Sequence, residues 1–488
     1  MKPISTPPVA SVLLEAMRAF GYSFEAAIAD LVDNSIAAGA SNVEIFFPPT
    51  GDVHVVLLDD GKGMTSGELA VAMRHGSRHP LEIRSERDLG RFGLGLKTAS
   101  LSQARRLTVV SKQGNAIAGD EWDLDEVARL EDWALLELDD KDLADVPLIS
   151  RLRQQPCGTM IVWRGLDRAL AGESAPTQAL QDHFDRTRSH LSLVFHRYLE
   201  GTQPELRIAI NGMPVTPLDP FLRQRSGRQS MPPETLDVAG HRVRVEAHIL
   251  PHISKLSAAE ICQAGGEDGL RRNQGFYVYR NRRLVIWGTW FRLARQEEMT
   301  KLARVIVDIP NTLDHLWSLD VKKSSAHPPD QVRQALRQIV DRIADRSRRV
   351  YSFRGNPTPS IGVVAAWQRM ELRGGRFRYL VNRNHDLFNA LHHAVPEADG
   401  ALLERFVQVV EDSVPYDAVY ADMAADRQPA CDESASELEE KLRDTASRLL
   451  AALTDLPQAR TATLNRLELL EPFCRHPGIT ARIKEELA

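Results

Sequence analysis

The sequence predicts an α/β fold class: an α/β sandwich with helices on one side of a mixed sheet, a second α/β domain, and a mainly helical C-terminal region. Apolar residues recur at helical spacing over residues 25–38. Apolar or alternating runs at 43–47 and 53–58 follow and are typical of paired strands. A second group of strand-like runs begins at residue 206, and amphipathic helical patterns dominate the chain after residue 376.

The first domain is expected to alternate helices and strands around a polar, charged stretch at 65–91. Gly39 ends the second helix. The predicted elements are helices over 9–20, 25–38 and 94–101 and strands over 43–47, 53–58, 107–111, 133–138 and 159–163.

A helical stretch over 177–199 is expected to lead into the second domain, which is expected to end with a long helix over 331–349. Residues 354–359 read as a linker, and a hairpin turn is expected at 373–376. The predicted domains are therefore 1–185, 186–350 and 351–488. The strands predicted for the second domain are 206–210, 243–249, 275–279, 283–286 and 303–309.

Composition excludes several protein classes. Lys and Arg (61) nearly balance Asp and Glu (66), and the net charge of −5 argues against a globally basic protein that coats nucleic acid. No run of 18 or more apolar residues is present, so we expect a cytoplasmic protein with no membrane partner. The four cysteines lie far apart and form no CxxC pair, which argues against a zinc site or a disulfide scaffold.

The first candidate motif lies in the helix over 25–38, where Asp30 and Asn34 are four residues apart and share a face. A carboxylate there could serve as a general base near a phosphoryl group. A carboxamide oxygen suits Mg²⁺. Surface helices often carry Asp and Asn, so a solvated face is the alternative interpretation.

The second motif places Asp59 at the end of a buried strand, with Gly61 and Gly63 just beyond it. An Asp in this position can accept a hydrogen bond from an exocyclic amine such as N6 of adenine, while glycines let the backbone lie flat against the base. The alternative is an ordinary DDG turn. The third motif is glycine-rich, spans 90–100 and opens a helix whose N-terminal amides can hold phosphates, although such turns are common.

Together and in this order, the three segments resemble the GHKL ATPases, which include DNA gyrase B, MutL, the MORC proteins, the large heat-shock chaperone and the sensor histidine kinases. The resemblance implies a Bergerat fold in which ADLVDNS, DDGKGM and GRFGLGLKTAS are the N-box, adenine motif and phosphate motif. It implies ATP and Mg²⁺ as cofactors, Asp30 as the catalytic base and Asn34 as the metal ligand. It also implies a lid over residues 65–92 with glycine hinges, and a threonine hydroxyl that helps bind adenine. The implied nucleotide-binding residues are Asn34, Asp59, Gly61, Gly63, Met64, Gly90, Gly93, Leu94, Gly95, Leu96, Lys97, Thr98 and Thr159.

Two residues depart from the family pattern. The family usually has Glu where this chain has Asp30, and many members have a second acidic residue where this chain has Ala37. Asp is one methylene shorter, which sets its carboxylate back by about 1.5 Å, and a misplacement of about 1 Å can cost on the order of 100-fold in rate. We therefore expect slow turnover. Asp33 is adjacent to Asn34, but one residue turns about 100° around a helix, so Asp33 is expected to be a poor substitute base.

Downstream segments at 206–221, 275–290 and 319–329 resemble the transducer domain of the MutL and MORC branch, an α/β domain of ribosomal-protein type. The resemblance implies that a loop lysine, Lys322 or Lys323, reaches the γ-phosphate as a catalytic cation. A solvated turn is the alternative for two adjacent lysines. Which of the two lysines would enter the site stays open.

The relatives dimerise on ATP, so we expect a nucleotide-dependent homodimer in which residues 1–20 reach across to the other protomer. Double-stranded DNA is the expected partner of this clamp, because arginines gather between residues 271 and 283 and along the helix over 331–349. Solubilising surface arginines are the alternative. The arginines of the first cluster are Arg271, Arg272, Arg280, Arg282 and Arg283.

Arrangement and size resemble bacterial MutL-like and MORC-like ATPases of restriction, phage-defence or repair systems, which implies a separate nuclease or other effector partner. Two other functions stay open: a chaperone-like protein remodeller, and a nucleotide-sensing assembly module with little turnover. In the C-terminal region, Asn382, Asn384, His385, His392 and His393 match no metal motif, and a hairpin followed by a helix explains them.

Overall fold

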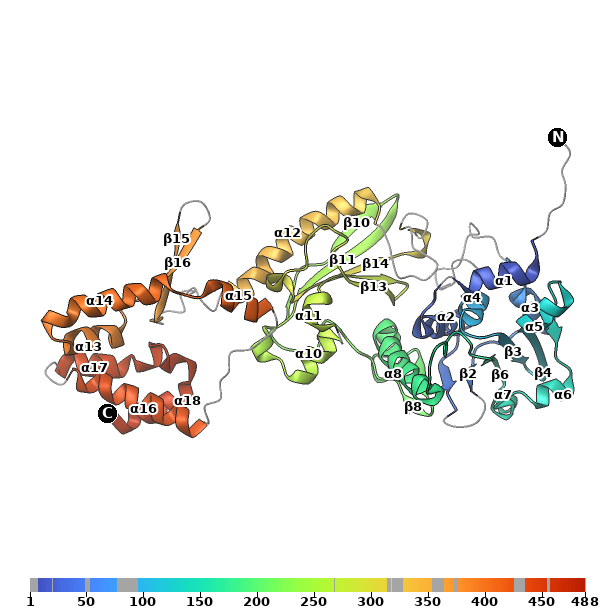
Figure 1. Ribbon diagram of the computed structural model, residues 1–488, viewed down its shortest axis with the longest axis horizontal. Coiled ribbons are helices and arrows are strands. Elements are labelled where there is room, and N and C mark those ends of the chain that lie inside the picture. The colour runs from blue at the N-terminus through green and yellow to red at the C-terminus, as the bar shows by residue number, and fades with distance from the viewer. Residues whose placement is uncertain are drawn as a thin grey trace. The chain divides into compact units, whose positions relative to one another are not determined.

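The computed structural model describes residues 8–19, 21–48, 53–76, 95–266, 268–313, 317, 328–352, 364–372, 376–424, 435–453 and 457–487. The chain forms two compact units, Met1–Ala344 and Asp345–Ala488, which we describe separately (Figure 1). The first unit contains two sheets with helices, and the second is mainly helical, which confirms the predicted α/β class. The limits 1–185, 186–350 and 351–488 stay a prediction.

The first sheet has eight strands in the order β5-β4-β3-β6-β2-β1-β7-β8. Strands β1 and β7 are parallel, and every other neighbouring pair is antiparallel, so the sheet is mixed as predicted. Its strands are β1 (Asn42–Phe46), β2 (His54–Asp59), β3 (Arg106–Gln113), β4 (Ala116–Asp123), β5 (Leu136–Glu137), β6 (Cys157–Arg164), β7 (Arg207–Ile210) and β8 (Met213–Pro214).

Alternation along the central strands gives this sheet two apolar faces. Val55 and Leu57 of β2 face the core that α1, α2, α4 and α8 cover, whereas Val56 and Leu58 face a smaller core under α6 and α7. The prediction of helices on one side is therefore incomplete, because two short helices cover part of the other face. The helices around this sheet are α1 (Ala10–Arg18), α2 (Phe24–Ala37), α3 (Ser66–Met73), α4 (Gly95–Leu101), α5 (Leu124–Leu130), α6 (Asp140–Ala144), α7 (Ile149–Gln154), α8 (Pro176–Val194) and α9 (His196–Leu199).

Helix α2 has clear start and stop signals. The Ser23 hydroxyl caps its N-terminus by accepting a hydrogen bond from the Ala26 N–H at 3.3 Å. After the last helical residue, Gly39 adopts φ +78°, a left-handed conformation that glycine takes without steric cost. The helix packs against both α4 and α8, so its central residues lie at the junction of three helices.

Strand β7 corrects one expectation. Residues 206–210 were expected to open the second sheet, but β7 pairs in parallel with β1, with Asn42 opposite Arg207. An apolar strand pattern predicts a strand and does not specify its partner, which here lies more than 150 residues away in the chain. The first sheet therefore extends beyond the predicted boundary at 185/186.

The second sheet follows the order β10-β11-β14-β12-β13, with β9 also paired to β11. Helix α12 covers it through apolar residues such as Leu336 and Ile343, which are fully buried. Its elements are β9 (Gln229–Ser230), β10 (Glu234–Val238), β11 (His241–Ile249), α10 (Ala258–Gly265), α11 (Gly269–Arg272), β12 (Gly275–Arg280), β13 (Arg283–Thr289), β14 (Ala303–Ile309) and α12 (Asp330–Ser352).

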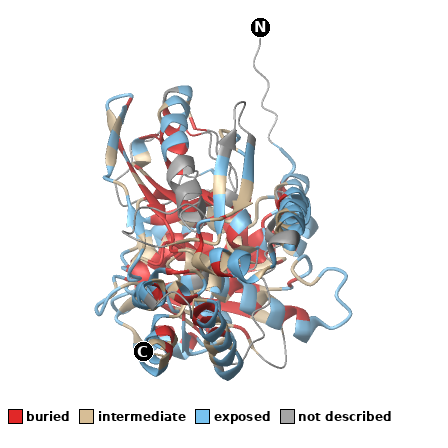
Figure 2. Ribbon diagram, turned by 90° about the vertical axis from the view of Figure 1, so that its left-hand side faces the viewer, coloured by how far each residue is buried: buried red, intermediate tan, exposed pale blue. Residues whose placement is uncertain are grey.

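The C-terminal unit contains a hairpin and six helices among its described residues, as the sequence predicts. Figure 2 shows exposed residues along the outer faces of helices, and the described residues of the C-terminal hairpin strands are exposed or half-buried. Within the described ranges, no helix is long and apolar enough to cross a membrane. The elements are β15 (Trp367–Leu372), β16 (Arg376–Val381), α13 (Asp386–Ala394), α14 (Glu397–Asp412), α15 (Tyr416–Ala424), α16 (Ala435–Ala451), α17 (Pro457–Asn465) and α18 (Pro477–Leu487).

Candidate functional site

Three segments that are far apart in the sequence meet at Asp59, the last residue of β2. The Ser35 hydroxyl, from α2, donates a hydrogen bond to Asp59 Oδ2 at 2.8 Å. Thr159 lies opposite Asp59 in the β2–β6 register, and its N–H donates to Asp59 Oδ1 at 3.2 Å. The predicted N-box helix, adenine motif and threonine segment therefore share one place in the fold.

The Asp59 carboxylate is held in a nearly water-free position, with 3% of the residue exposed. The Gly61 N–H donates a further hydrogen bond to Oδ1 at 2.9 Å. Burial raises the pKa of Asp59, because a charged carboxylate loses its hydration, and the hydrogen bonds from Gly61, Ser35 and Thr159 oppose that rise. The result is an oriented acceptor beside the glycine turn, as recognition of an exocyclic amine requires.

The glycines of the adenine motif lie where a side chain would collide with the backbone. A Cβ at Gly63 would lie 1.9 Å from the Lys112 carbonyl oxygen, and Gly63 has φ +68°. A Cβ at Gly61 would lie 2.9 Å from the Ala38 Cβ. These contacts explain why glycine is required at both positions.

Met64 and Thr159 are linked through Ser111 of β3. The Met64 N–H donates to Ser111 Oγ at 2.8 Å, and Ser111 Oγ lies 3.1 Å from Thr159 Oγ1. The predicted threonine hydroxyl is thus held by a serine that the sequence analysis did not single out. No local motif marks Ser111, which reaches the site only because β3 pairs with β6.

Asp30 lies on α2 beside the start of α4. Tyr22 donates its hydroxyl to Asp30 Oδ2 at 3.1 Å, and Asp30 is 7% exposed. A Cβ built on Gly95 would lie 3.9 Å from the same oxygen, so the carboxylate is close to the first residue of α4. The proposed base and the phosphate motif are therefore neighbours.

Asn34 provides a test of whether the site suits Mg²⁺ and ATP. Its Nδ2 atom is buried and has no hydrogen-bond partner among the described residues. A buried amide without a partner is unfavourable in the protein alone, and a ligand can satisfy it. Since amide oxygen and nitrogen are exchanged by a side-chain flip, Asn34 can present the oxygen that a magnesium ion requires. The residues present fit the implied cofactor.

The described part of helix α4, Gly95–Leu101, includes the predicted phosphate-binding residues Gly95, Leu96, Lys97 and Thr98. The N–H groups of a first helical turn have no acceptor within the helix, which suits phosphate oxygens. The Lys97 side chain is directed elsewhere: its ammonium donates to the Ala72 and Arg74 carbonyls at 2.7 and 2.9 Å. Burial lowers the pKa of Lys97 to about 8. Only its backbone lies in the predicted phosphate turn.

Several predicted site residues lie outside the described residues. These are Gly90, Gly93 and Leu94 of the phosphate motif and both transducer lysines, Lys322 and Lys323. Within the predicted lid, α3 is described and begins at a capping box between Thr65 and Glu68.

The first arginine cluster is exposed only in part, which weakens one argument for DNA: Arg271, Arg272 and Arg282 are exposed, and the other two arginines are buried. Arg280 and Arg283 are 3% and 5% exposed. Arg282 pairs with Glu205 at 2.6 Å, and Arg272 pairs with Asp268 at 3.1 Å. Strand β12 is buried along its whole length, so arginines at its end are drawn into the structure and paired there.

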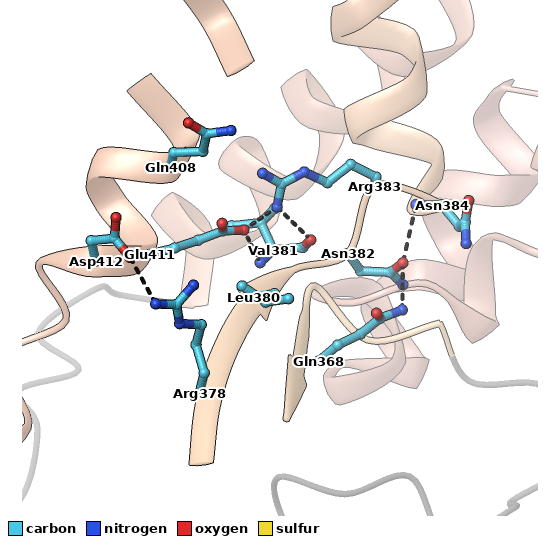
Figure 3. A pocket seen from close by; sticks show the side chains of 10 residues that line it. All are labelled: Gln368, Arg378, Leu380, Val381, Asn382, Arg383, Asn384, Gln408, Glu411 and Asp412. Carbon is cyan, nitrogen blue, oxygen red and sulfur yellow. Dashed lines mark hydrogen bonds and ion pairs between the residues drawn. The ribbon is translucent and has the colours of Figure 1, made fainter. Parts of the chain in front are cut away.

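The C-terminal unit contains a polar pocket of about 460 Å³ between the hairpin and α14 (Figure 3). Arg383 pairs with Glu411, which also accepts the Val381 N–H at 2.7 Å, and Arg378 lies 3.6 Å from Asp412. Each arginine thus has a carboxylate partner. The lining residues are Gln368, Arg378, Leu380, Val381, Asn382, Arg383, Asn384, Gln408, Glu411 and Asp412.

The predicted hairpin followed by a helix is confirmed in this unit. His385 caps α13, and its Nδ1 accepts a hydrogen bond from the Leu387 N–H at 3.2 Å. Asn382 donates to the Ala365 carbonyl at 2.9 Å and accepts from Gln368 at 2.8 Å. These side chains stabilise the hairpin and the start of the helix.

Comparison with known proteins agrees with the geometry of the first unit. Residues 22–159 match the family described as histidine kinase-, DNA gyrase B- and HSP90-like ATPase. The DNA mismatch repair protein MutL of Rhodospirillum rubrum is 34% identical over 99 residues, which cover 20% of this chain and 15% of the relative. MutL of Halobacterium salinarum is 33% identical over 91 residues, which cover 18% and 14%.

MutL of a Rhodopseudomonas palustris strain is 40% identical over 62 residues, which cover 13% of this chain and 10% of the relative. The matched segments thus span 15% or less of the length of these curated relatives. The matched family region contains Asp30, Asp59 and Gly95, which the structure brings together. By its sequence motifs and their assembly around Asp59, the segment 22–159 is a GHKL-type ATPase domain that is similar in sequence to MutL.

Proposed function

We propose that this chain binds ATP with Mg²⁺ and hydrolyses it slowly to ADP and phosphate, and that the nucleotide closes a homodimer as a clamp on DNA. One observation carries the proposal. Ser35, Thr159 and Gly61 converge on the buried carboxylate of Asp59, while Asp30 from the same helix as Ser35 lies beside Gly95. This arrangement supports an adenine contact at one end of the site and a base next to the phosphates at the other.

The roles follow from the chemistry of each group. Asp59 accepts a hydrogen bond from the adenine amine, and Gly61 and Gly63 allow the base to approach the backbone. Bound Mg²⁺ would neutralise phosphate charge, and Asn34 would hold it. Asp30 accepts a proton from the attacking water. Because Asp30 is one methylene shorter than Glu, turnover is slow.

The remaining nucleotide contacts rest on the family resemblance. Gly90, Gly93 and Leu94 complete the phosphate loop and hinge the lid, the first turn of α4 holds phosphate oxygens, and the Thr159 hydroxyl lies beside adenine. Lys322 or Lys323 supplies a cation to the γ-phosphate, which stabilises charge on the transferred group.

Helix α1 supports the proposed dimer. Its residues Ala10 and Leu14 are buried, whereas Val12 is 67% and Leu13 37% exposed, and Val9 just before the helix is 59% exposed. An amphipathic helix whose outer side is also apolar suits a contact with a second protomer. The segment 1–20 would therefore take part in closure of the clamp.

Two observations support DNA as the substrate of the clamp. The matched relatives are DNA mismatch repair proteins by name. Helix α12 presents Arg333, Arg337 and Arg342 on its exposed side, opposite its buried apolar side. Since arginine neutralises phosphate charge without reading bases, such a helix suits duplex DNA of any sequence. We further propose a separate nuclease or other effector and a MORC-like or MutL-like role in phage defence, restriction or DNA repair.

Substitution of Asp30 tests the hydrolytic part of the proposal. Asp30→Asn removes the base and should abolish turnover, with the dissociation constant of a non-hydrolysable ATP analogue within about twofold of the wild-type value. Asp30→Glu should raise turnover if the short side chain limits the rate. Phosphate release measures turnover and calorimetry measures binding. Normal hydrolysis by Asp30→Asn would show that Asp30 is not the base.

The clamp is tested by size and by DNA. Light scattering should show a monomer without nucleotide and a dimer with the ATP analogue. Duplex DNA should stimulate hydrolysis, and the effect should weaken as salt rises, because phosphate contacts release counterions. Absence of both DNA binding and stimulation would favour a protein remodeller. Binding of ATP with no measurable turnover would favour the nucleotide-sensing module.

A further inference from the structure

Arg283, the first residue of β13, reaches from the second sheet into the nucleotide site. Its Nε lies 2.7 Å from Asp33 Oδ1, and its Nη2 lies 3.7 Å from Asp30 Oδ1. The three side chains are 6%, 2% and 8% exposed, respectively. One guanidinium therefore lies against two carboxylates of α2 in a nearly dry environment.

Helical geometry explains how one arginine serves both acids. Residues three apart on a helix point about 60° from each other, so Asp30 and Asp33 lie on neighbouring parts of the same surface. The planar guanidinium offers several donors in a fixed fork, which a lysine cannot reproduce. Its face also lies 5.5 Å from the Phe195 ring centroid. The contact with Asp33 lacks hydrogen-bond geometry, and the 3.7 Å to Asp30 exceeds hydrogen-bond range, so Arg283 acts on both acids as the cation of two ion pairs.

The turn before Arg283 fixes where its side chain begins. Arg280 and Arg283 are opposite each other in the β12–β13 register, and Asn281 and Arg282 between them have φ +48° and +68°. Two residues with positive φ give the tight hairpin whose twist matches the strands. The turn is anchored to α9 beside the first sheet, because Tyr198 donates its hydroxyl to the Asn281 carbonyl at 2.5 Å.

We propose that Arg283 is a positioning residue for Asp30, through which the second sheet controls the geometry of ATP hydrolysis. The inference rests on the proposed function. Tyr22 holds Asp30 Oδ2, the oxygen next to Gly95, and Arg283 faces Oδ1. The carboxylate is thereby held from two sides, one of which belongs to another sheet. A shift of the hairpin moves Arg283, and the orientation of Asp30 changes with it.

Three variants test this role. Arg283→Met keeps much of the side-chain volume and removes the charge and the donors. Arg283→Lys keeps the charge and loses the fork. Arg282→Met is the matched control, because it removes the neighbouring arginine of the same turn, which pairs with Glu205 rather than with α2. The measurements on the full chain are kcat, KM, the dissociation constant of a non-hydrolysable ATP analogue, and the melting temperature.

We expect Arg283→Met to lower kcat by about 100-fold, the effect of misplacing a catalytic group by roughly 1 Å, with analogue affinity within about twofold of wild type. Arg283→Lys should recover part of the loss, and Arg282→Met should keep kcat within about twofold. If Arg283→Met does not fold, a fall of about tenfold in kcat for Arg283→Lys at unchanged analogue affinity carries the same conclusion.

Three results would overturn the inference, and each has a different meaning. In the first result, the wild-type protein hydrolyses ATP, and Arg283→Lys and any folded Arg283→Met do so at the same rate. This result would exclude the positioning role and leave the proposed function unchanged. A wild-type protein that binds ATP without hydrolysing it would refute the proposed turnover, and the positioning role with it. A loss of kcat equal in Arg282→Met and Arg283→Met would assign the effect to the hairpin rather than to Arg283.

Discussion

The buried carboxylate of Asp59 separates nucleotide recognition from stability, which makes Asp59→Asn an informative substitution. The wild-type carboxylate accepts hydrogen bonds from Gly61, Thr159 and Ser35 and can accept another from the adenine amine. An asparagine can keep its oxygen toward the two backbone N–H groups and turn its amide nitrogen toward the serine hydroxyl. That nitrogen is a donor, so it repels the adenine amine instead of accepting from it.

We expect Asp59→Asn to have effects of opposite sign on ATP affinity and on stability without nucleotide. Loss of a hydrogen bond to a charged acceptor costs about 1.5–3 kcal/mol, which corresponds to ATP binding weakened by about 10- to 100-fold. Stability without nucleotide should be unchanged or higher at pH 7. Since burial raises the pKa of Asp59, the charged carboxylate disfavours the folded state, and this cost appears as the pH rises from the ordinary pKa of Asp through the raised one. Asparagine carries no such cost.

Calorimetry of ATP binding and thermal unfolding without nucleotide measure the two effects. Asp60→Asn is the matched control: the Asp60 carboxylate accepts the N–H groups of Ser41 and Asn42 at 2.7 and 2.8 Å, and its effect on Asp59 is that of a neighbouring charge. It should leave ATP affinity within about twofold. Asp59→Asn with wild-type ATP affinity would refute the assignment of the adenine contact.

Two further predictions concern stability. Gly63→Ala should destabilise the fold by about 2–5 kcal/mol and weaken ATP binding, because the new Cβ meets the Lys112 carbonyl and the backbone has positive φ. In the control Gly67→Ala the new Cβ meets open space, so this variant should not be destabilised. Equal melting temperatures of the two variants would contradict the prediction. Burial lowers the pKa of four histidines of the first unit to about 4. Below pH 6.5 the unfolded chain binds protons that the folded chain does not, so the free energy of unfolding falls as the pH falls toward 4, by at most about 3 kcal/mol for each histidine. The urea midpoint of unfolding should fall steeply between pH 7.5 and 4.5, and a midpoint that does not change with pH would contradict this prediction. The residues are His75, His190, His196 and His248.

Local signals in the sequence predict much of the fold. Helix α2 is predicted within one residue at each end, because its apolar spacing and Gly39 agree. Strand β4 is missing from the prediction, since its sequence AIAGDEWD has mixed polarity and it forms by pairing with β3. Strand β7 is predicted as a strand but in the wrong sheet. Pairing between distant segments is the information that a pattern lacks.

In the candidate site, too, local motifs predict some residues, and tertiary contacts bring in the others. Asp30, Asp59 and Gly95 lie in motifs with fixed spacing, and the sequence predicts them together. Tyr22 and Ser111 contribute through tertiary contacts that no spacing encodes. Arg283 was predicted as one of a cluster of DNA-contacting arginines, and the structure buries it between two acids. A run of arginines reads as a basic surface until their burial is known.

The buried position of Arg283 also bears on how an Asp can stand where the family usually has Glu. A shorter side chain reaches less far, so its direction matters more. The structure gives Asp30 a donor on Oδ2 from Tyr22 and a guanidinium facing Oδ1, and places Gly95, which has no side chain to intervene, beside Oδ2. Because the guanidinium comes from the second sheet, full alignment of this short carboxylate depends on how that sheet sits against α2. Turnover in this chain would then be slow because the Asp30 side chain is short, and its rate would depend on the position of the second sheet. A nucleotide-driven clamp requires both properties to stay closed until its partner acts.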